Sequence, residues 1–164
     1  MSPHLAIRDP QSGAYSRAFF DEVVDREVER SHRHGSVLSV LSVVLVNWEE
    51  FSGSMSAGAL EGALHTIANT LQANVRLTDY LFRWEDDEFI VLLVEANLDG
   101  CRTKVSRLAA TFRPWRDGMG PIPEKLKIRV GAATLEAGNV FPTVLQMARA
   151  AAHGRSGELP AVHV

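Results

Sequence analysis

The chain has very little cysteine and no large excess of charge of either sign. Its 164 residues include one cysteine, Cys101, which excludes an intramolecular disulfide and a cysteine-based zinc site. Seventeen basic residues against 20 acidic ones give a formal net charge of −3, which argues against a general nucleic-acid or anionic-membrane binder. The most apolar segment, Val37 to Val46, is too short to cross a bilayer, and the polar N-terminus predicts no signal peptide. We therefore expect a cytoplasmic protein without membrane insertion or a nucleic-acid partner.

The chain does contain enough apolar residues for a core. Hydrophobic residues make up 46% of the sequence and charged residues 23%. At this length a chain can bury roughly two-thirds of its unfolded surface without a disulfide or structural metal. We expect residues 1–164 to form a single domain. Fourteen of the 17 basic residues are arginine, whose planar fork binds phosphate and guanine well.

Hydrophobic periodicity predicts an alternation of helices and strands. Apolar residues recur at helical spacing in segments at Phe19–Val28, Leu60–Leu71, Cys101–Phe112 and from about Pro142 onward. Apolar runs rich in β-branched or alternating residues predict strands at residues 37–46, 80–84, 89–94 and 126–130. The stretch from Arg113 to Pro123 holds three prolines and two glycines and is expected to be a loop.

After the first helix, the predicted order is strand, helix, strand, strand, helix, strand. This order is the split β-α-β pattern of ferredoxin-like folds. The predicted fold class is therefore α/β, a sandwich in which helices flank a mainly antiparallel central sheet. In this topology the first and third strands form the central pair, so Asn47 at the end of the first strand is expected beside the hairpin that joins the second and third.

That hairpin, Arg83 to Phe89, resembles the signature hairpin of the GGDEF family. Members of this family are bacterial diguanylate cyclases, which join two GTP molecules into cyclic di-GMP. Residues 9–20 resemble the family's opening motif D-x-L-T-G-L-x-N-R-x-x-F, and residues 130–133 resemble its glycine-containing last strand. The resemblance extends from residue 9 to about 155 and implies a ferredoxin-like core of the nucleotide-cyclase type.

The resemblance also implies a metal site that is incomplete here. The family needs two divalent metals, held by carboxylates at the end of the first strand and in the hairpin. Asn47 replaces the strand-end aspartate, and an amide oxygen is a weaker ligand for a hard cation. We regard Asn47, the Trp48 carbonyl and Asp87 as a vestigial metal site. Ser52 follows Phe51 where the family has a lysine.

The signature itself is degenerate, because Glu85 and Asp86 replace two glycines. A two-residue hairpin turn favours positive φ, which glycine supplies, so we expect Glu85 to fit this turn poorly and to project toward the substrate. Asp87, Glu88 and Phe89 match the signature, which leaves Asp87 and Glu88 as vestigial catalytic residues. The four consecutive carboxylates would repel a triphosphate, and a solvated acidic turn is the simpler interpretation.

A second motif is retained. Arg76 and Asp79 fit the family's R-x-x-D inhibitory motif at the expected distance from the hairpin, and Arg107 falls where related proteins contribute a further arginine. The resemblance implies that these three residues bind cyclic di-GMP as a stacked pair. Arginine can bond the O6/N7 edge of guanine and also reach phosphate, and Asp79 can accept from guanine N–H groups. The alternative for Arg76 and Asp79 is an exposed ion pair of little consequence.

The sequence therefore predicts a non-catalytic GGDEF domain that acts as a cyclic di-GMP receptor. Two alternatives stay open. One is a weakly active diguanylate cyclase that uses Mg²⁺ with Asp87, Glu88, the Trp48 carbonyl and Asn47. The other is a protein-interaction or dimerisation module that binds no nucleotide. No cofactor is expected unless residual GTP binding brings Mg²⁺, and a homodimer is left open.

Overall fold

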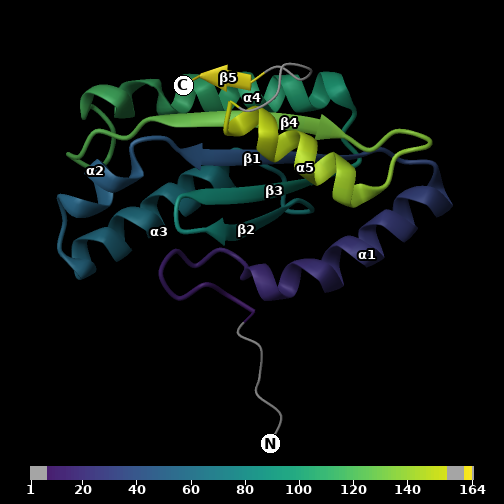
Figure 1. The fold of residues 1–164 in the computed structure, drawn as a ribbon, viewed down its shortest axis with the longest axis horizontal. Coiled ribbons are helices and arrows are strands. Elements are labelled where there is room, and N and C mark those ends of the chain that lie inside the picture. The colour runs from purple at the N-terminus through teal and green to yellow at the C-terminus, as the bar shows by residue number, and fades with distance from the viewer. Residues whose placement is uncertain (1–6, 155–160, 164) are drawn as a thin grey trace, which may run out of the picture.

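A computed structural model describes residues 7–154 and the backbone of residues 161–163. The end of the family resemblance, at residue 155, lies outside these ranges. Five described strands form one sheet in the order β2-β3-β1-β4-β5, and each neighbouring pair is antiparallel (Figure 1). The strands are β1 (Leu38–Leu45), β2 (Tyr80–Glu85), β3 (Glu88–Val94), β4 (Ile128–Thr134) and β5 (Ala161–His163). The helices are α1 (Arg17–His34), α2 (Trp48–Gly53), α3 (Ala57–Ala73), α4 (Leu98–Phe112), η1 (Arg113–Asp117, 3₁₀) and α5 (Phe141–Ala152).

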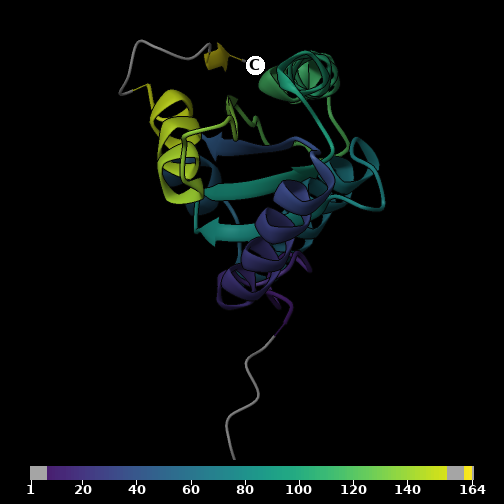
Figure 2. The same ribbon diagram turned by 90° about the vertical axis from the view of Figure 1, so that its right-hand side faces the viewer.

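Helices cover both faces of the sheet, with α1 and α5 on one side and α3 and α4 on the other (Figure 2). Successive side chains along a strand point to opposite faces of the sheet. All eight residues of β1 are buried because helices cover both of these faces. Leu41 and Val43 pack in the core under α3 and α4, whereas Leu38 and Val40 pack under α1 and α5. The predicted fold class, with a mainly antiparallel sheet flanked by helices, is confirmed.

Gly131 of β4 marks the place where α5 lies closest to the sheet. A Cβ atom at this position would lie 2.2 Å from the Ala148 carbonyl oxygen and 2.4 Å from the Ala152 nitrogen. Both distances are far below van der Waals contact, so any side chain here would push α5 away from β4. The glycine thus fixes the position of α5, whose inner face forms one wall of the site described below.

The structure contains three short elements that the sequence did not predict. The segment expected to be a loop from Arg113 begins with the short helix η1, in which Trp115 is buried and its ring centroid lies 4.6 Å from that of Phe112. Proline at the start of a helix gives up an N–H group that would be unpaired anyway, so Pro114 is compatible with it. The helix α2 and strand β5 were not predicted, because each is too short for a periodic pattern. None of the described helices is long and apolar enough to span a bilayer.

Candidate functional site

The end of β1 and the β2–β3 hairpin meet at one edge of the sheet. The Leu45 N–H donates to the Asp87 carbonyl oxygen at 2.8 Å, and Val44 pairs with Glu88 across the two strands. This confirms that the hairpin is a neighbour of the strand end. It brings the segment that contains Asn47 next to the acidic turn.

The hairpin turn is not the one that the sequence predicted. Strand β2 continues to Glu85, which pairs with Glu88 after an irregularity at Trp84, so Asp86 and Asp87 form the turn. Among the described non-glycine residues, Glu95 alone has a positive φ. The expectation that Glu85 must adopt a positive φ is therefore wrong, because the irregular register places it in the strand. Its carboxylate binds Arg17 at 2.6 Å, and both side chains are about half exposed.

Arg83 ties this turn to the N-terminal motif. Its side chain is 7% exposed, and it donates to the backbone carbonyl oxygens of Glu85, at 3.0 Å, and of Asp86. It also forms an ion pair at 3.2 Å with Asp9, which accepts in turn from the Ser12 backbone and hydroxyl. The opening motif and the hairpin are thus one hydrogen-bonded unit, which sequence reasoning had not joined.

Glu88 is fully buried and its carboxylate is saturated by partners. Arg149 of α5 donates to it in a fork, through Nε and Nη2, both at 2.9 Å. The Ser42 hydroxyl donates at 2.6 Å, and the His153 ring nitrogen lies 3.2 Å away. Burial raises the pKa of Glu88, but the hydrogen bonds from Arg149 and Ser42 and the positive charge of Arg149 outweigh it and hold the pKa below its ordinary value. Glu88 is therefore the anion of an internal ion pair.

These residues do not fit a divalent cation. The Asn47 carboxamide is held by backbone groups, donating to the Lys125 carbonyl oxygen at 2.8 Å and accepting from the Lys127 N–H at 2.9 Å. Glu88 already has a cationic partner in Arg149. Within residues 7–154, no group of three or more His, Cys, Asp or Glu side chains is arranged to hold a metal ion. Mg²⁺ binds through carboxylate oxygens, and Asp87 is the acid of the vestigial set whose carboxylate has no hydrogen bond or ion pair within residues 7–154, although its charge acts on Arg149.

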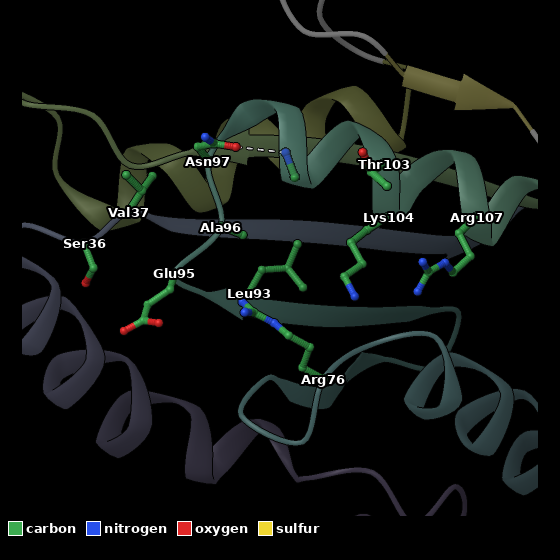
Figure 3. A pocket seen from close by; sticks show the side chains of 11 residues that line it. Ser36, Val37, Arg76, Leu93, Glu95, Ala96, Asn97, Thr103, Lys104 and Arg107 are labelled. Carbon is green, nitrogen blue, oxygen red and sulfur yellow. Dashed lines mark hydrogen bonds between the residues drawn. The ribbon is translucent and has the colours of Figure 1, made fainter.

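A second site lies near the other end of β3. Arg76 and Arg107 line one cavity of about 550 Å³ beside α4 (Figure 3). The structure thus brings together two of the three residues that the R-x-x-D resemblance singled out. Lys104 lines the same cavity, and Figure 3 shows Lys104 and Arg107 extending from α4 over β3 toward the loop of Arg76. Sequence reasoning missed Lys104, although its spacing of three residues from Arg107 places both on one helix face.

The third residue of the motif, Asp79, is not in the wall of this cavity. Its side chain is fully buried, and its two oxygens accept from the backbone N–H groups of Arg76 and Val94, each at 2.9 Å. Asp79 thereby fixes the Arg76 loop to β3. The Arg76 side chain is 48% exposed, lies 3.8 Å from Asp79 and donates to the Val94 carbonyl oxygen. Its guanidinium is held at the cavity and still accessible.

The chain is similar to known proteins over most of its length. Residues 6–154 match the family model described as "Diguanylate cyclase, GGDEF domain". The chain is 30% identical over 97 residues to diguanylate cyclase DosC of Escherichia coli, which covers 59% of this chain and 21% of DosC. It is also 30% identical over 107 residues to diguanylate cyclase DgcP of Pseudomonas aeruginosa, which covers 65% of this chain and 16% of DgcP. The chain therefore spans about a fifth of the length of these relatives.

Solved structures share the fold. The GGDEF domain of FimX from P. aeruginosa superimposes with a TM-score of 0.80 at 15% identity, covering 92% of this chain and 94% of that one. The GGDEF domain of DgcB from Caulobacter crescentus, in complex with c-di-GMP, gives 0.78 at 14% identity and covers 94% and 92%. Diguanylate cyclase SiaD of P. aeruginosa, in complex with its activator SiaC, gives 0.79 at 23% identity and covers 92% and 58%.

Proposed function

Because this chain belongs to the GGDEF family of diguanylate cyclase domains, we propose that it is a non-catalytic member that acts as a receptor for cyclic di-GMP. The observation that carries the proposal is the cavity lined by Arg76, Lys104 and Arg107. Two separate segments of the chain bring three cationic side chains to it. Glu95 is the one acidic side chain among the described residues of the same lining (Figure 3), so the cationic side chains outnumber the acidic one and favour an anionic ligand.

The chemistry of cyclic di-GMP matches these side chains. The ligand carries two phosphate charges and two guanine bases. An arginine fork can donate two parallel hydrogen bonds to a phosphate or to the O6/N7 edge of guanine, and Arg76 and Arg107 both supply one. Lys104 adds a point charge suited to phosphate. We assign Asp79 a positioning role, since it holds the backbone of Arg76.

The non-catalytic part of the proposal is supported by the hairpin edge. The conserved chemistry of the family would need carboxylates free to hold metal, but here Arg149 and backbone groups occupy Glu88 and Asn47. The purified chain is therefore expected to form no cyclic di-GMP from GTP with Mg²⁺ or Mn²⁺, as measured by chromatography of the products. Product that disappears in an Asp87→Ala variant would contradict this and support the weakly active cyclase.

Restoring the signature turn alone is expected to leave the chain inactive. A Glu85→Gly/Asp86→Gly variant regains the family's glycines, yet it leaves Asn47 without a charge for metal and Glu88 paired with Arg149. The same product assay, run beside the unaltered chain, tests this. Turnover of GTP by the double variant would mean that the turn was the main defect.

Isothermal titration of the full chain with cyclic di-GMP tests the receptor function directly. We expect binding with two ligand molecules per chain, the stacked pair that the R-x-x-D motif implies. An absence of heat at high micromolar ligand would leave the interaction module as the remaining function. Binding of one ligand molecule per chain would support the receptor function but contradict the stacked pair.

Lys104→Ala is expected to weaken cyclic di-GMP binding and to make it less sensitive to salt. Lys104 meets the ligand as a charge, so its removal deletes part of the screened electrostatic attraction. Arg102→Ala is the matched control, because Arg102 lies on the same helix, is exposed and is absent from the cavity wall. Affinities measured at two salt concentrations decide the matter. Equal losses for the two variants would show only a general effect of charge on α4.

Asp79→Asn separates positioning from direct ligand contact. In the variant, the side-chain NH₂ group of residue 79 faces the backbone N–H of either Arg76 or Val94, which then has no acceptor. Loss of this buried hydrogen bond lowers the free energy of unfolding by about 1–3 kcal/mol. We expect a lower Tm together with weaker cyclic di-GMP binding, because the Arg76 loop loses its anchor. A loss of affinity at unchanged Tm would instead indicate that Asp79 contacts guanine directly.

A further inference from the structure

The face of the sheet covered by α1 and α5 holds a second, largely apolar cavity. It has a volume of about 480 Å³ and lies between the two helices. Its apolar wall includes Phe20, Val24, Trp84, Leu135, Phe141 and Leu145. It shares no lining residue with the cavity of Arg76 and Arg107, so a ligand here would be independent of the proposed receptor function. Its size is within the range of cavities that bind small molecules or peptide side chains.

Acidic groups stand at the edge of this apolar space. Asp21 and Asp25 line the cavity from α1, one helical turn apart, and both are exposed. Across residues 7–154, neither carboxylate has a hydrogen bond or an ion pair. His32 and Asn139 are the other polar side chains of the lining. The rim therefore offers two uncompensated negative charges beside an apolar pocket, which favours a ligand that is both apolar and cationic.

The wall also contains an unsatisfied donor. The indole Nε1 of Trp84 is buried and has no hydrogen-bond partner among the described residues. The ring itself is well packed, with Phe20 edge-on at 4.8 Å between centroids and the Arg17 guanidinium 4.2 Å from its centroid. A buried N–H without a partner is costly, so a rearrangement of this wall on ligand binding that brings an acceptor to Nε1 is favourable.

We propose that this cavity is a docking site for a protein segment that carries an apolar side chain next to a lysine or arginine. The apolar side chain would occupy the space beside Phe141 and Leu145, and the basic one would pair with Asp21 or Asp25. The carbonyl groups of a peptide are hydrogen-bond acceptors of the kind that the Trp84 indole N–H lacks among the described residues. A peptide meets all three requirements at once, whereas an acidic segment or a phosphorylated one is repelled by the two carboxylates.

Panning a phage library of random short peptides against the full chain tests this proposal. We expect enriched sequences in which an apolar residue lies within a helical turn of a lysine or arginine. A synthetic peptide of that sequence is expected to shift the Trp84 indole N–H resonance, which a Trp84→Phe variant identifies. Failure to enrich any sequence, enrichment of acidic sequences, or a peptide that leaves this resonance unmoved would overturn the proposal.

Charge variants make the test specific. Asp21→Asn/Asp25→Asn is expected to weaken binding of the synthetic peptide at least about tenfold, since two opposing charges at the rim are lost. Glu22→Gln/Glu29→Gln removes the same charge from exposed positions of the same helix that do not line the cavity, and it is expected to leave the affinity nearly unchanged. Equal affinities in the two double variants would overturn the proposal. So would competition by cyclic di-GMP through the Arg76 cavity.

Both double variants are expected to keep the Tm of the unaltered chain, because all four side chains are exposed. Self-association of the chain that the peptide reverses would show that a second copy, rather than a different partner, fills the cavity. This outcome would also contradict the proposal as stated. The peptide titration and the cyclic di-GMP titration are separate measurements, so each function can fail without the other.

Discussion

Replacing Arg149 with methionine is expected to destabilise the domain by about 3–5 kcal/mol, because it leaves a buried carboxylate without its cation. Glu88 has no solvent exposure, and Arg149 supplies two of its hydrogen bonds and its main positive charge. The remaining partners, Ser42 and His153, offer one hydrogen bond each. Urea unfolding at neutral pH measures the loss. A loss that exceeds the whole stability of the domain would appear as an unfolded protein by circular dichroism.

Two further variants make this prediction falsifiable. Arg17→Met breaks the exposed ion pair with Glu85, in which both side chains are about half exposed, and we expect it to cost under about 1 kcal/mol. Glu88→Gln/Arg149→Met removes both buried charges, and it is expected to recover most of the stability lost by Arg149→Met alone. If the single variants at Arg17 and Arg149 cost the same, the buried pair has no special role.

The same ion pair predicts how stability depends on pH. The pKa of Glu88 in the folded protein lies below its ordinary value of 4.5, so the unfolded chain takes up a proton more readily than the folded one. The contribution of Glu88 is therefore fully present above about pH 4.5 and is lost as the pH falls through the folded-state pKa. Acid unfolding curves of the unaltered chain and of Glu88→Gln are expected to converge at low pH. Parallel curves would contradict the assignment.

Arg76→Ala is expected to weaken cyclic di-GMP binding by roughly ten- to a hundredfold. A bidentate contact between arginine and guanine contributes about 1–3 kcal/mol of discrimination in nucleic-acid recognition, and about 1.4 kcal/mol corresponds to one decade. The Arg76 side chain is half exposed, and Asp79 keeps its two backbone hydrogen bonds in the variant, so the Tm is expected to fall only slightly with the loss of the Arg76 contacts to Asp79 and Val94. Titration calorimetry measures the affinity, and the Tm, compared with that of Asp79→Asn, shows whether the Arg76 loop is still held in place.

Arg116→Ala serves as the control for charge. Arg116 is exposed in η1 and does not line the cavity, so its loss is expected to leave the affinity nearly unchanged. Arg107→Ala should weaken binding as Arg76→Ala does, because both residues line the cavity. If the unaltered chain and Arg76→Ala bind cyclic di-GMP with equal affinity, the R-x-x-D motif is not part of the binding site. The proposed receptor function would then lose its basis.

The sequence by itself determined the arrangement of the main elements. Local periodicity of 3.6 or 2 residues reports which face of a helix or strand is apolar, and this signal survives in any context. It therefore located β1, the β2–β3 hairpin and the four long helices. The topology that follows from their order placed the end of β1 beside the hairpin, as the bond from Leu45 to Asp87 confirms.

Tertiary structure decided what the polar side chains at the two sites do. Glu88 matches the family signature, but its partners Arg149 and His153 lie 61 and 65 residues further along the chain, and α5 brings them to it. Asp79 fits the R-x-x-D motif, yet it binds the backbone of Val94 across the sheet edge instead of lining the cavity. The physical reason is that a buried polar group bonds whichever partners packing brings within about 3 Å, and spacing along the sequence carries no information about partners that distant.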